Sequence, residues 1–318
     1  MTPPDFTVSR IGQINAGGAV DAIFLKVFAG EVLTAFTRKN KALGNHLIRS
    51  ISSGKSAQFP AMGRVGTSYH TPGVTIDGSV INHAEEVVTI DGNAIATTFI
   101  SNIDEAMNHY DVRAPYSGEM GKALATLMDT NMLRMGVIGA ATATPTVTGL
   151  PGGTVLTYDA TAPDAVELLV SQMFTAAQTL DQNDADEEDR FAYVKPSTYY
   201  SFINATSKLI NRDYTGGDNG GVDTGVILRI AGIKQVKTNN LPVVDDSANG
   251  AIPTQYRANF LKNVALIAQR ASIGTVKLID LGLESEYVVR NQGTFMVAKY
   301  ACGHKWLRQA SLVQIKTL

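Results

Sequence analysis

The chain is poor in cysteine, in tryptophan and in charged side chains. Its 318 residues include one cysteine, Cys302, and one tryptophan. A single cysteine excludes an intramolecular disulfide and any zinc site built from several thiolates, and it is typical of a protein kept in a reducing compartment. Charged residues make up 18% of the chain, against roughly 25% in an average soluble protein. This composition favours a surface that is covered in part by partner molecules.

An excess of positive charge and a targeting segment are also missing. The net charge is −2 at pH 7. This argues against avid nucleic-acid binding, because several Lys and Arg must then neutralise phosphates. The first residues, MTPPDFTVSRIGQINAGGA, lack the basic start and the apolar run of a signal peptide. We therefore expect the protein to fold in a cytoplasm.

The common catalytic and ligand-binding motifs are incomplete. SSGKS at 52–56 lacks the earlier glycine of a phosphate-binding loop, because Arg49 occupies that position. The acidic run 184–189 does not match a calcium loop and is interpreted as a solvated turn. His304 lies two residues from Cys302, but a lone buried thiol is favoured over a Cys–His nucleophile. The sequence predicts no catalytic residue, no metal site, no cofactor and no enzyme.

The segment Tyr116–Gly139 predicts the longest helix of the chain. Pro115 lies in its first turn, where a helix tolerates proline, and Asp111 is a candidate cap. Charges inside the segment exclude a membrane span. We predict a core helix in which Leu127→Asp would prevent folding by burying a charge. The apolar face expected from three-and-four spacing contains Met120, Leu124, Leu127, Met128, Met135 and Ile138, and the polar side contains Glu119, Lys122, Thr126, Asp129 and Arg134.

Two segments before this helix must pack against another part of the protein, or against another subunit, to be stable. Residues 20–37 are apolar almost all round and predict a buried helix at the end of an extended arm. Residues 46–60 and 84–100 predict the strands of a long hairpin with a Gly-rich tip at 61–83. A hairpin that is polar on both faces is marginally stable alone. We favour a neighbouring subunit as the surface that orders it, and the alternative is a hairpin lying flat on its own domain.

The chain after residue 140 predicts an α+β unit followed by strands. A Gly/Pro/Thr linker at 141–154 precedes a helix over 161–181, in which Thr161 is the cap and Phe174 faces inward. A further helix opens at Pro196. The predicted strands are Arg190–Val194, Val226–Ile230, Gln235–Thr238, Val264–Gln269, Gly274–Leu281, Ser285–Val289, Thr294–Tyr300 and the closing segment SLVQIKTL.

Six stretches over most of the chain form a more specific signal. They are FLKVFAGEVLTAF (24–36), RSISSGKSAQFP (49–60), TIDG (89–92), DEAMNHYDVR (104–113), GTVKL (274–278) and AKYACGH (298–304). In this order they resemble the major capsid protein of T-seven-like short-tailed bacteriophages, the podoviruses. The departures from the family lie between about 140 and 262.

The resemblance implies the α+β Hong Kong 97-type capsid fold. Residues 1–45 would form an N-terminal arm with a short helix, and 46–100 an extended β-hairpin called the E-loop. Residues 101–149 and 263–318 would form a peripheral domain with a long spine helix and a long sheet, and 150–262 an axial domain.

The resemblance also implies a structural role in the virion. The family builds icosahedral shells of hexamers and pentamers around double-stranded DNA in the host cytoplasm. Its partners are a scaffolding protein during assembly and portal and tail proteins. Whether a decoration protein also binds is left open by the resemblance. Candidate intersubunit contacts on the hairpin are Lys55, Arg64, Tyr69, His70, Glu85 and Glu86. Some relatives of the wider fold cross-link through lysine and asparagine, but the hairpin shows no matching motif and no cross-link is expected.

Three other functions are weighed against the capsid. An encapsulin-type compartment would use the same fold, and DNA inside native particles would separate the two. An enzyme using residues 150–262 would reveal a bound cofactor or a cleft. A nucleic-acid-binding module is weaker still, because it would need the salt-sensitive affinity that a net charge of −2 does not suggest.

Overall fold

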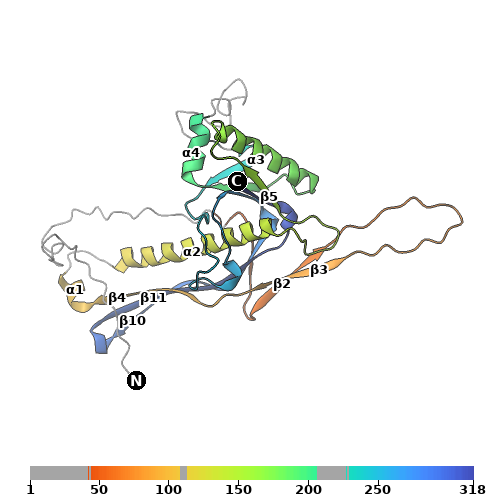
Figure 1. The fold of residues 1–318 in the computed structure, drawn as a ribbon. Coiled ribbons are helices and arrows are strands. Elements are labelled where there is room, and N and C mark those ends of the chain that lie inside the picture. The colour runs from red at the N-terminus through yellow and green to blue at the C-terminus, as the bar shows by residue number, and fades with distance from the viewer. Residues whose placement is uncertain (1–41, 43, 108–112, 206–226, 228) are drawn as a thin grey trace. The chain divides into compact units, whose positions relative to one another are not determined.

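The computed structural model describes residues 42, 44–107, 113–205, 227 and 229–318 (Figure 1). The predicted helix at 20–37 and the candidate cap Asp111 lie outside these residues. Contacts divide the chain into two compact units. In the described part, the first unit contains 91–107, 113–128 and 278–302, and the second contains the remaining residues. The backbone passes from one unit to the other within helix α2 (Arg113–Ala141) and within strands β10 (Ile273–Val288) and β11 (Gly293–Trp306).

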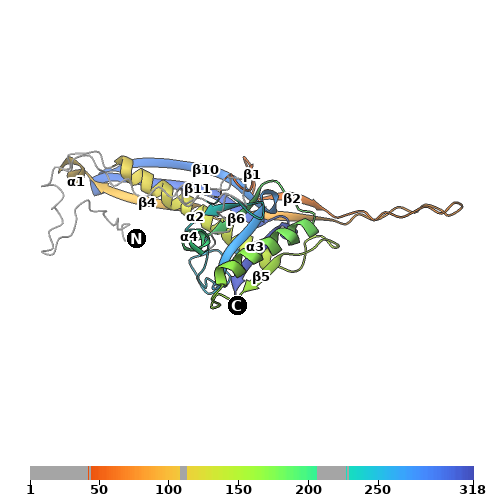
Figure 2. The ribbon, with the colours of Figure 1, turned by 90° about the horizontal axis from the view of Figure 1, so that it is seen from above.

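The first unit is built on long strands and the start of α2. Strand β4 (Ala94–Ser101) pairs antiparallel with β11, with Ala94 opposite Tyr300 and Ser101 opposite Gly293 (Figure 2). Helix α1 (Asn102–Met107) follows β4 directly. The core that these elements share contains Ile100, Met120, Leu124, Met128, Met296, Ala298, Tyr300 and Cys302.

Strand β10 corrects one prediction from the sequence. The segments Gly274–Leu281 and Ser285–Val289 were expected to be separate strands, but Ile273–Val288 is one strand of 16 residues that continues through Gly282. It lies between β1 (Leu47–Ser50) and β11 in a sheet of order β1-β10-β11-β4. Backbone pairing within the sheet outweighs the weak local preference of a single glycine.

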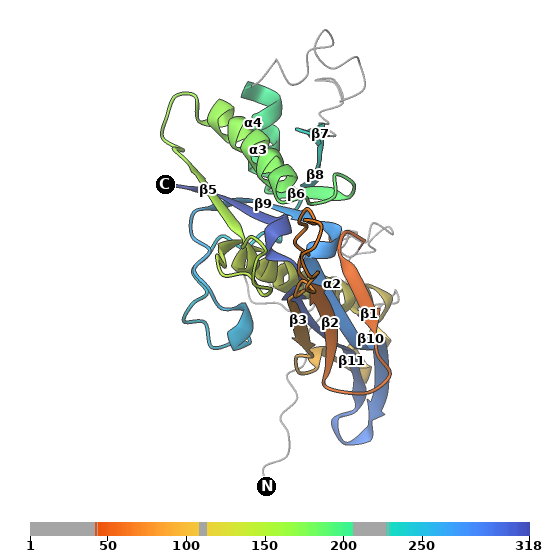
Figure 3. The same cartoon turned by 90° about the vertical axis from the view of Figure 1, so that its right-hand side faces the viewer.

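The second unit is organised around a six-stranded mixed sheet. Its strand order is β5-β12-β9-β6-β8-β7. Strands β5 and β12 and strands β6 and β8 pair in parallel, and the other neighbours are antiparallel. Helices α3 (Ala165–Gln182) and α4 (Pro196–Ala205) lie on one side of this sheet (Figure 3). The strands are β5 (Thr154–Tyr158), β6 (Arg190–Val194), β7 (Arg229–Ile230), β8 (Ile233–Lys237), β9 (Asn263–Gln269) and β12 (Leu312–Thr317).

This sheet is buried on both faces. In β6, Ala192 and Val194 join the cluster that includes Met173 of α3, whereas Phe191 and Tyr193 join the cluster that includes Leu133 of α2. Successive side chains of a strand point to opposite faces, so all five residues of β6 are buried. Short 3₁₀ turns of the second unit lie at Thr254–Tyr256, Arg270–Ser272 and Gln309–Ser311, and one of the first unit lies at Val289–Asn291 between β10 and β11.

Three side chains of the long helices do not lie where periodicity predicts. Leu127 is 40% exposed, so the expectation that Leu127→Asp buries a charge is wrong. Phe174 of α3 is 55% exposed although an inward position was predicted. Asp129 is buried instead of solvated, and Asn240 donates to its carboxylate over 3.3 Å. The core side of α2 between 120 and 128 repeats at four residues, which turns Leu127 to the flank.

The start of α3 also differs from its prediction. The helix begins at Ala165, and Asp164 occupies the cap position without a side-chain cap bond. The backbone N–H and the hydroxyl of Thr161 donate to the Asp159 carboxylate over 2.8 and 2.7 Å. Thr161 therefore belongs to a turn before the helix, because its hydroxyl bonds to Asp159 and not to a backbone N–H of the first helical turn.

The hairpin is shorter than the predicted one. Only β2 (Ser56–Met62) and β3 (His83–Thr89) pair with each other, from Ser56 opposite Thr89 to Met62 opposite His83. Residues 47–50 pair in parallel with β10, and 94–101 pair with β11. Gly54, with φ of 106°, lies between β1 and β2, where the chain leaves one sheet for the other.

We expect Leu133→Ala to lower the free energy of unfolding by about 2–5 kcal/mol, because Leu133 is buried between α2 and the six-stranded sheet. Leu127→Ala, on the same helix but exposed, should cost less than about 1 kcal/mol. Urea unfolding of the unassembled subunit measures both. Equal losses would contradict this placement of the two leucines.

Candidate functional site

The loop at residues 63–82, here called the tip, exposes large apolar side chains. It extends from the ends of β2 and β3 without strand pairing of its own (Figure 1). The N–H of Gly63 donates to the carbonyl of Asn82 at its base over 2.8 Å. Ile76 is 77% exposed and Tyr69 is fully exposed. The other exposed apolar residues of the tip are Val65, Val74, Val80 and Ile81. Such a concentration of apolar surface marks a protein contact site.

A polar contact fixes the root of the tip on the second unit. The Arg64 guanidinium forms an ion pair with Asp184 over 2.6 Å and donates to the carbonyl of Asn183 over 3.2 Å. From the returning chain, the Asn82 side chain donates to the carbonyl of Thr148 over 3.2 Å. Because Arg64 and Asp184 are both largely exposed, this pair contributes orientation more than stability.

A second contact, at Glu86, is buried. Lys305 of β11 forms an ion pair with the Glu86 carboxylate over 2.6 Å, and the hydroxyl of Thr146 donates to the other carboxylate oxygen. The backbone N–H of Thr146 donates to the side-chain oxygen of Gln309 over 3.3 Å. A buried carboxylate is tolerated when it is paired and hydrogen-bonded in this way. The cluster therefore joins β3, the linker after α2 and β11 inside one unit.

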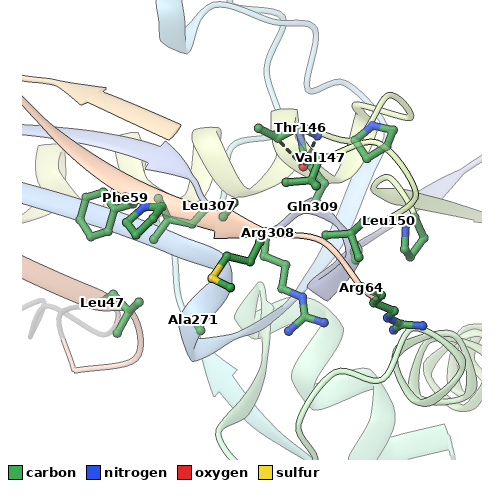
Figure 4. A pocket seen from close by; sticks show the side chains of 16 residues that line it. Leu47, Phe59, Arg64, Thr146, Val147, Leu150, Ala271, Leu307, Arg308 and Gln309 are labelled. Atoms are coloured by element: carbon green, nitrogen blue, oxygen red, sulfur yellow. Dashed lines mark hydrogen bonds between the residues drawn. The ribbon is translucent and has the colours of Figure 1, made fainter. Parts of the chain in front are cut away.

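A groove lies beside β2 at the root of the tip. It has a volume of about 370 Å³ and is open on one side (Figure 4). Apolar side chains form most of its wall, among them Phe59, Met62, Leu150 and Leu307. Arg64 and Arg308 supply positive charge at its edge. The hairpin thus combines an exposed apolar tip with an apolar groove at its root.

The six residues predicted as intersubunit contacts lie in three different environments. Lys55, Tyr69 and His70 are exposed on the hairpin. Glu85 is exposed and accepts a hydrogen bond from Gln58 over 3.3 Å. Arg64 and Glu86 are paired within their own chain, as described above.

The partners of Arg64 and Glu86 were missed at the level of sequence. Asp184 was interpreted as part of a solvated acidic turn, and Lys305 and Thr146 were not singled out. These residues lie about 60 to 220 positions from their partners along the chain, and no local pattern links positions so far apart. The one available signal was the position of Glu86, which shares a strand face with Ala84 and Val88.

Two buried histidines lie in the second unit. Burial lowers the pKa of His46 to about 4, with smaller contributions from Lys277 and Arg270, and a hydrogen bond to the carbonyl of Ala42 opposes this shift. Burial lowers the pKa of His304 to about 3, and His46 adds to the effect. Both imidazoles are therefore neutral at pH 7.

Among the described residues, no three His, Cys, Asp or Glu side chains gather to hold a metal ion. None of the helices in that part of the chain is long and apolar enough to cross a bilayer. Cys302 is not part of a disulfide and is buried in the core of the first unit.

Solved structures define the class of the protein. The fold is similar to that of the capsid of the cyanophage P-SCSP1u, with a TM-score of 0.82 and 40% identity over 99% of both chains. It is also similar to the mature capsid of bacteriophage PhiM1, with a TM-score of 0.78, 18% identity, and coverage of 98% and 96%. The protein is a phage capsid protein with the Hong Kong 97-type fold.

Sequence comparison narrows the class to one family. The chain is 36% identical over 313 residues to the major capsid protein of Enterobacteria phage T3, covering 90% of this chain and 89% of that protein. It is 34% identical over 321 residues to the major capsid protein of Escherichia phage T7, covering 93% and 92%. Residues 58–316 match the Gp10A-like major capsid protein family, and the chain belongs to it. It is a structural protein of the virion.

We expect Glu86→Ala to lower the free energy of unfolding by about 1–3 kcal/mol, because Lys305 and Thr146 lose their buried partner. Glu85→Ala removes an exposed carboxylate from the adjacent position and should cost less than about 0.5 kcal/mol. Thermal unfolding of the two variants beside the wild type compares them. A larger loss for Glu85→Ala would show that the Glu86 cluster does not stabilise the unit.

Proposed function

We propose that the chain forms the hexamers and pentamers of an icosahedral head that encloses double-stranded DNA. In this proposal the β2–β3 hairpin is the E-loop and contacts a neighbouring subunit. The observation that carries it is the apolar surface of the tip, which includes Tyr69, Val74, Ile76 and Val80 in exposed positions. Membership of the major capsid protein family supports the shell itself.

The exposed apolar side chains of the tip are unfavourable in water and gain free energy when a partner covers them. Each apolar side chain of this size contributes about 1.5–3 kcal/mol when it leaves water, and several stand together in the tip. The root of the hairpin is fixed by the pairs of Arg64 and Glu86, so the tip is presented in a defined direction relative to the second unit. A contact between two different surfaces of identical subunits closes into a ring when the rotation allows it. Capsomer rings of this kind are what the proposal requires.

The domain roles follow the family pattern in the same proposal. Residues 1–45 form the arm, and 46–100 contain the E-loop. Residues 101–149 with 263–318 form the peripheral domain with α2 as the spine helix, and 150–262 form the axial domain. The continuous strands β10 and β11 support the long peripheral sheet, and helices α3 and α4 on the six-stranded sheet support the axial domain.

The proposed partners are a scaffolding protein during assembly, and portal and tail proteins in the finished particle. A decoration protein would add to the outer surface where one is present. DNA is enclosed without sequence-specific binding, which agrees with a net charge of −2. The relatives named above are phage capsid proteins, and they favour a DNA-filled head over an encapsulin-type compartment.

We expect Ile76→Asp to reduce shell assembly at least tenfold at a given subunit concentration. The substitution replaces an apolar contact by a charge that must lose its hydration, and about 1.4 kcal/mol corresponds to a factor of ten. The fold should be retained, because Ile76 is exposed. Sedimentation and electron microscopy measure the assembled fraction, and circular dichroism checks the fold.

The matched control is Val244→Asp, an equally charged substitution at an exposed apolar residue of the same unit outside the hairpin. It should assemble more completely than Ile76→Asp. A second variant that lacks residues 66–79 should give a folded subunit that assembles poorly. Normal assembly of the deletion variant would refute the role proposed for the hairpin.

A further inference from the structure

His46 is buried immediately before strand β1, at the point where the described chain enters the second unit. Its side chain is 4% exposed. The ring nitrogen Nδ1 lies 2.7 Å from the carbonyl oxygen of Ala42, which also accepts from the N–H of Asn45 over 2.9 Å. A carbonyl cannot donate, so Nδ1 carries the proton of the neutral ring. The other nitrogen, Nε2, is buried without a hydrogen-bond partner among the described residues.

The charged groups that act on this imidazole are basic. Lys277 lies on β10 and Arg270 in the 3₁₀ turn after β9, and each opposes a positive charge on His46. Arg270 is itself paired with Asp189 over 3.3 Å at an exposed position. From β11, the imidazole of His304 is electrostatically coupled to His46. A proton on Nε2 would therefore create a buried donor without an acceptor and a charge beside like charges.

His304 is fixed by its own contacts and is not free to accommodate that charge. It is 2% exposed, and its Nδ1 lies 2.8 Å from the hydroxyl of Thr275. Its backbone N–H donates to the hydroxyl of Tyr256 over 3.1 Å. Strand β10 has β1, which follows His46, as one neighbour in the sheet and β11, which carries His304, as the other.

Strand β1 is short, at four residues, and a few contacts hold its flanks. Asn45 forms a side-chain hydrogen bond with Tyr193, and the N–H of Ile51 donates to the carbonyl of Lys277 over 2.9 Å. Strand β1 is the edge strand of its sheet and pairs in parallel with β10, from Leu47 opposite Gly274 to Ser50 opposite Lys277. All four of its residues are exposed. The buried side chains next to it are Ala42, in the core of the second unit, and His46. Short exposed edge strands open at low cost in free energy.

We propose that His46 is an acid-sensitive anchor, and that protonation of its imidazole releases strand β1 and the turn before it from the sheet while the core of the second unit stays folded. The neutral ring fits its buried position, whereas the charged ring is stable only in water. This device acts within one subunit and does not depend on the role proposed for the hairpin.

The direction of the pH dependence follows from the pKa of His46 in the attached state and in the released state. The imidazole titrates near about 6.5 when it is in water, and burial lowers the pKa of His46 to about 4 in the folded state. The released state therefore binds more protons, so the attachment is complete above about pH 6.5 and is lost as the pH falls toward 4. Between pH 7 and pH 5 the released fraction should rise about twentyfold.

Hydrogen exchange on assembled wild-type shells at pH 7, 6 and 5 tests this proposal. Protection factors, corrected for the intrinsic pH dependence of exchange, should fall about twentyfold between pH 7 and 5 for residues 44–50. Those of the central strand β9 should stay constant, because its side chains are buried in the core. Unchanged protection of residues 44–50 over this range would overturn the proposal.

His46→Asn keeps a donor for the Ala42 carbonyl and cannot titrate, so its protection at residues 44–50 should not change with pH. The matched control, His83→Asn, removes an exposed histidine at the start of β3 and should behave like the wild type. A wild-type pH response in His46→Asn would refute the anchor. If that variant does not fold, NMR titration of the His46 imidazole in the wild-type subunit decides, since a pKa above 6 would refute it as well.

Discussion

Burial of both faces of the six-stranded sheet is the constraint on which the second unit depends. Strands β6, β9 and β12 alternate their side chains between the cluster under α3 and α4 and the cluster under the last turns of α2. A strand buried on both faces cannot shift its register by one residue without exchanging the two sets of side chains.

The root of the hairpin determines its direction, and the tip provides the surface for a partner. Its root is specified by polar contacts of Arg64 and Glu86 inside the chain, whereas its tip presents apolar side chains to the outside. Polar pairs have strict geometry, so they determine direction, and apolar surface has little directional demand, so it tolerates adjustment to a partner. This division suits a subunit that must make related but unequal contacts at different positions of a shell.

Local sequence patterns predicted the elements of the fold better than their partners. Helix α2, strand β6 and the start of α4 at Pro196 were found close to their observed bounds. The extent of the hairpin was wrong because β1 and β4 pair with strands about 200 residues later in the chain. A Gly-rich tip was predicted at 61–83, but its exposed apolar side chains and the buried state of Glu86 and Asp129 were not. Periodicity reports which faces are apolar, not which distant side chain will neutralise a buried charge.

The single cysteine provides a natural site for measuring how often the core of the first unit opens. Cys302 is buried in the core of the first unit, among side chains of β4, α2 and β11. A thiol reagent reaches it only when that core opens, and no second thiol in the chain competes for the reagent. The rate of labelling therefore measures how often a subunit opens inside a finished shell, without the introduction of any probe.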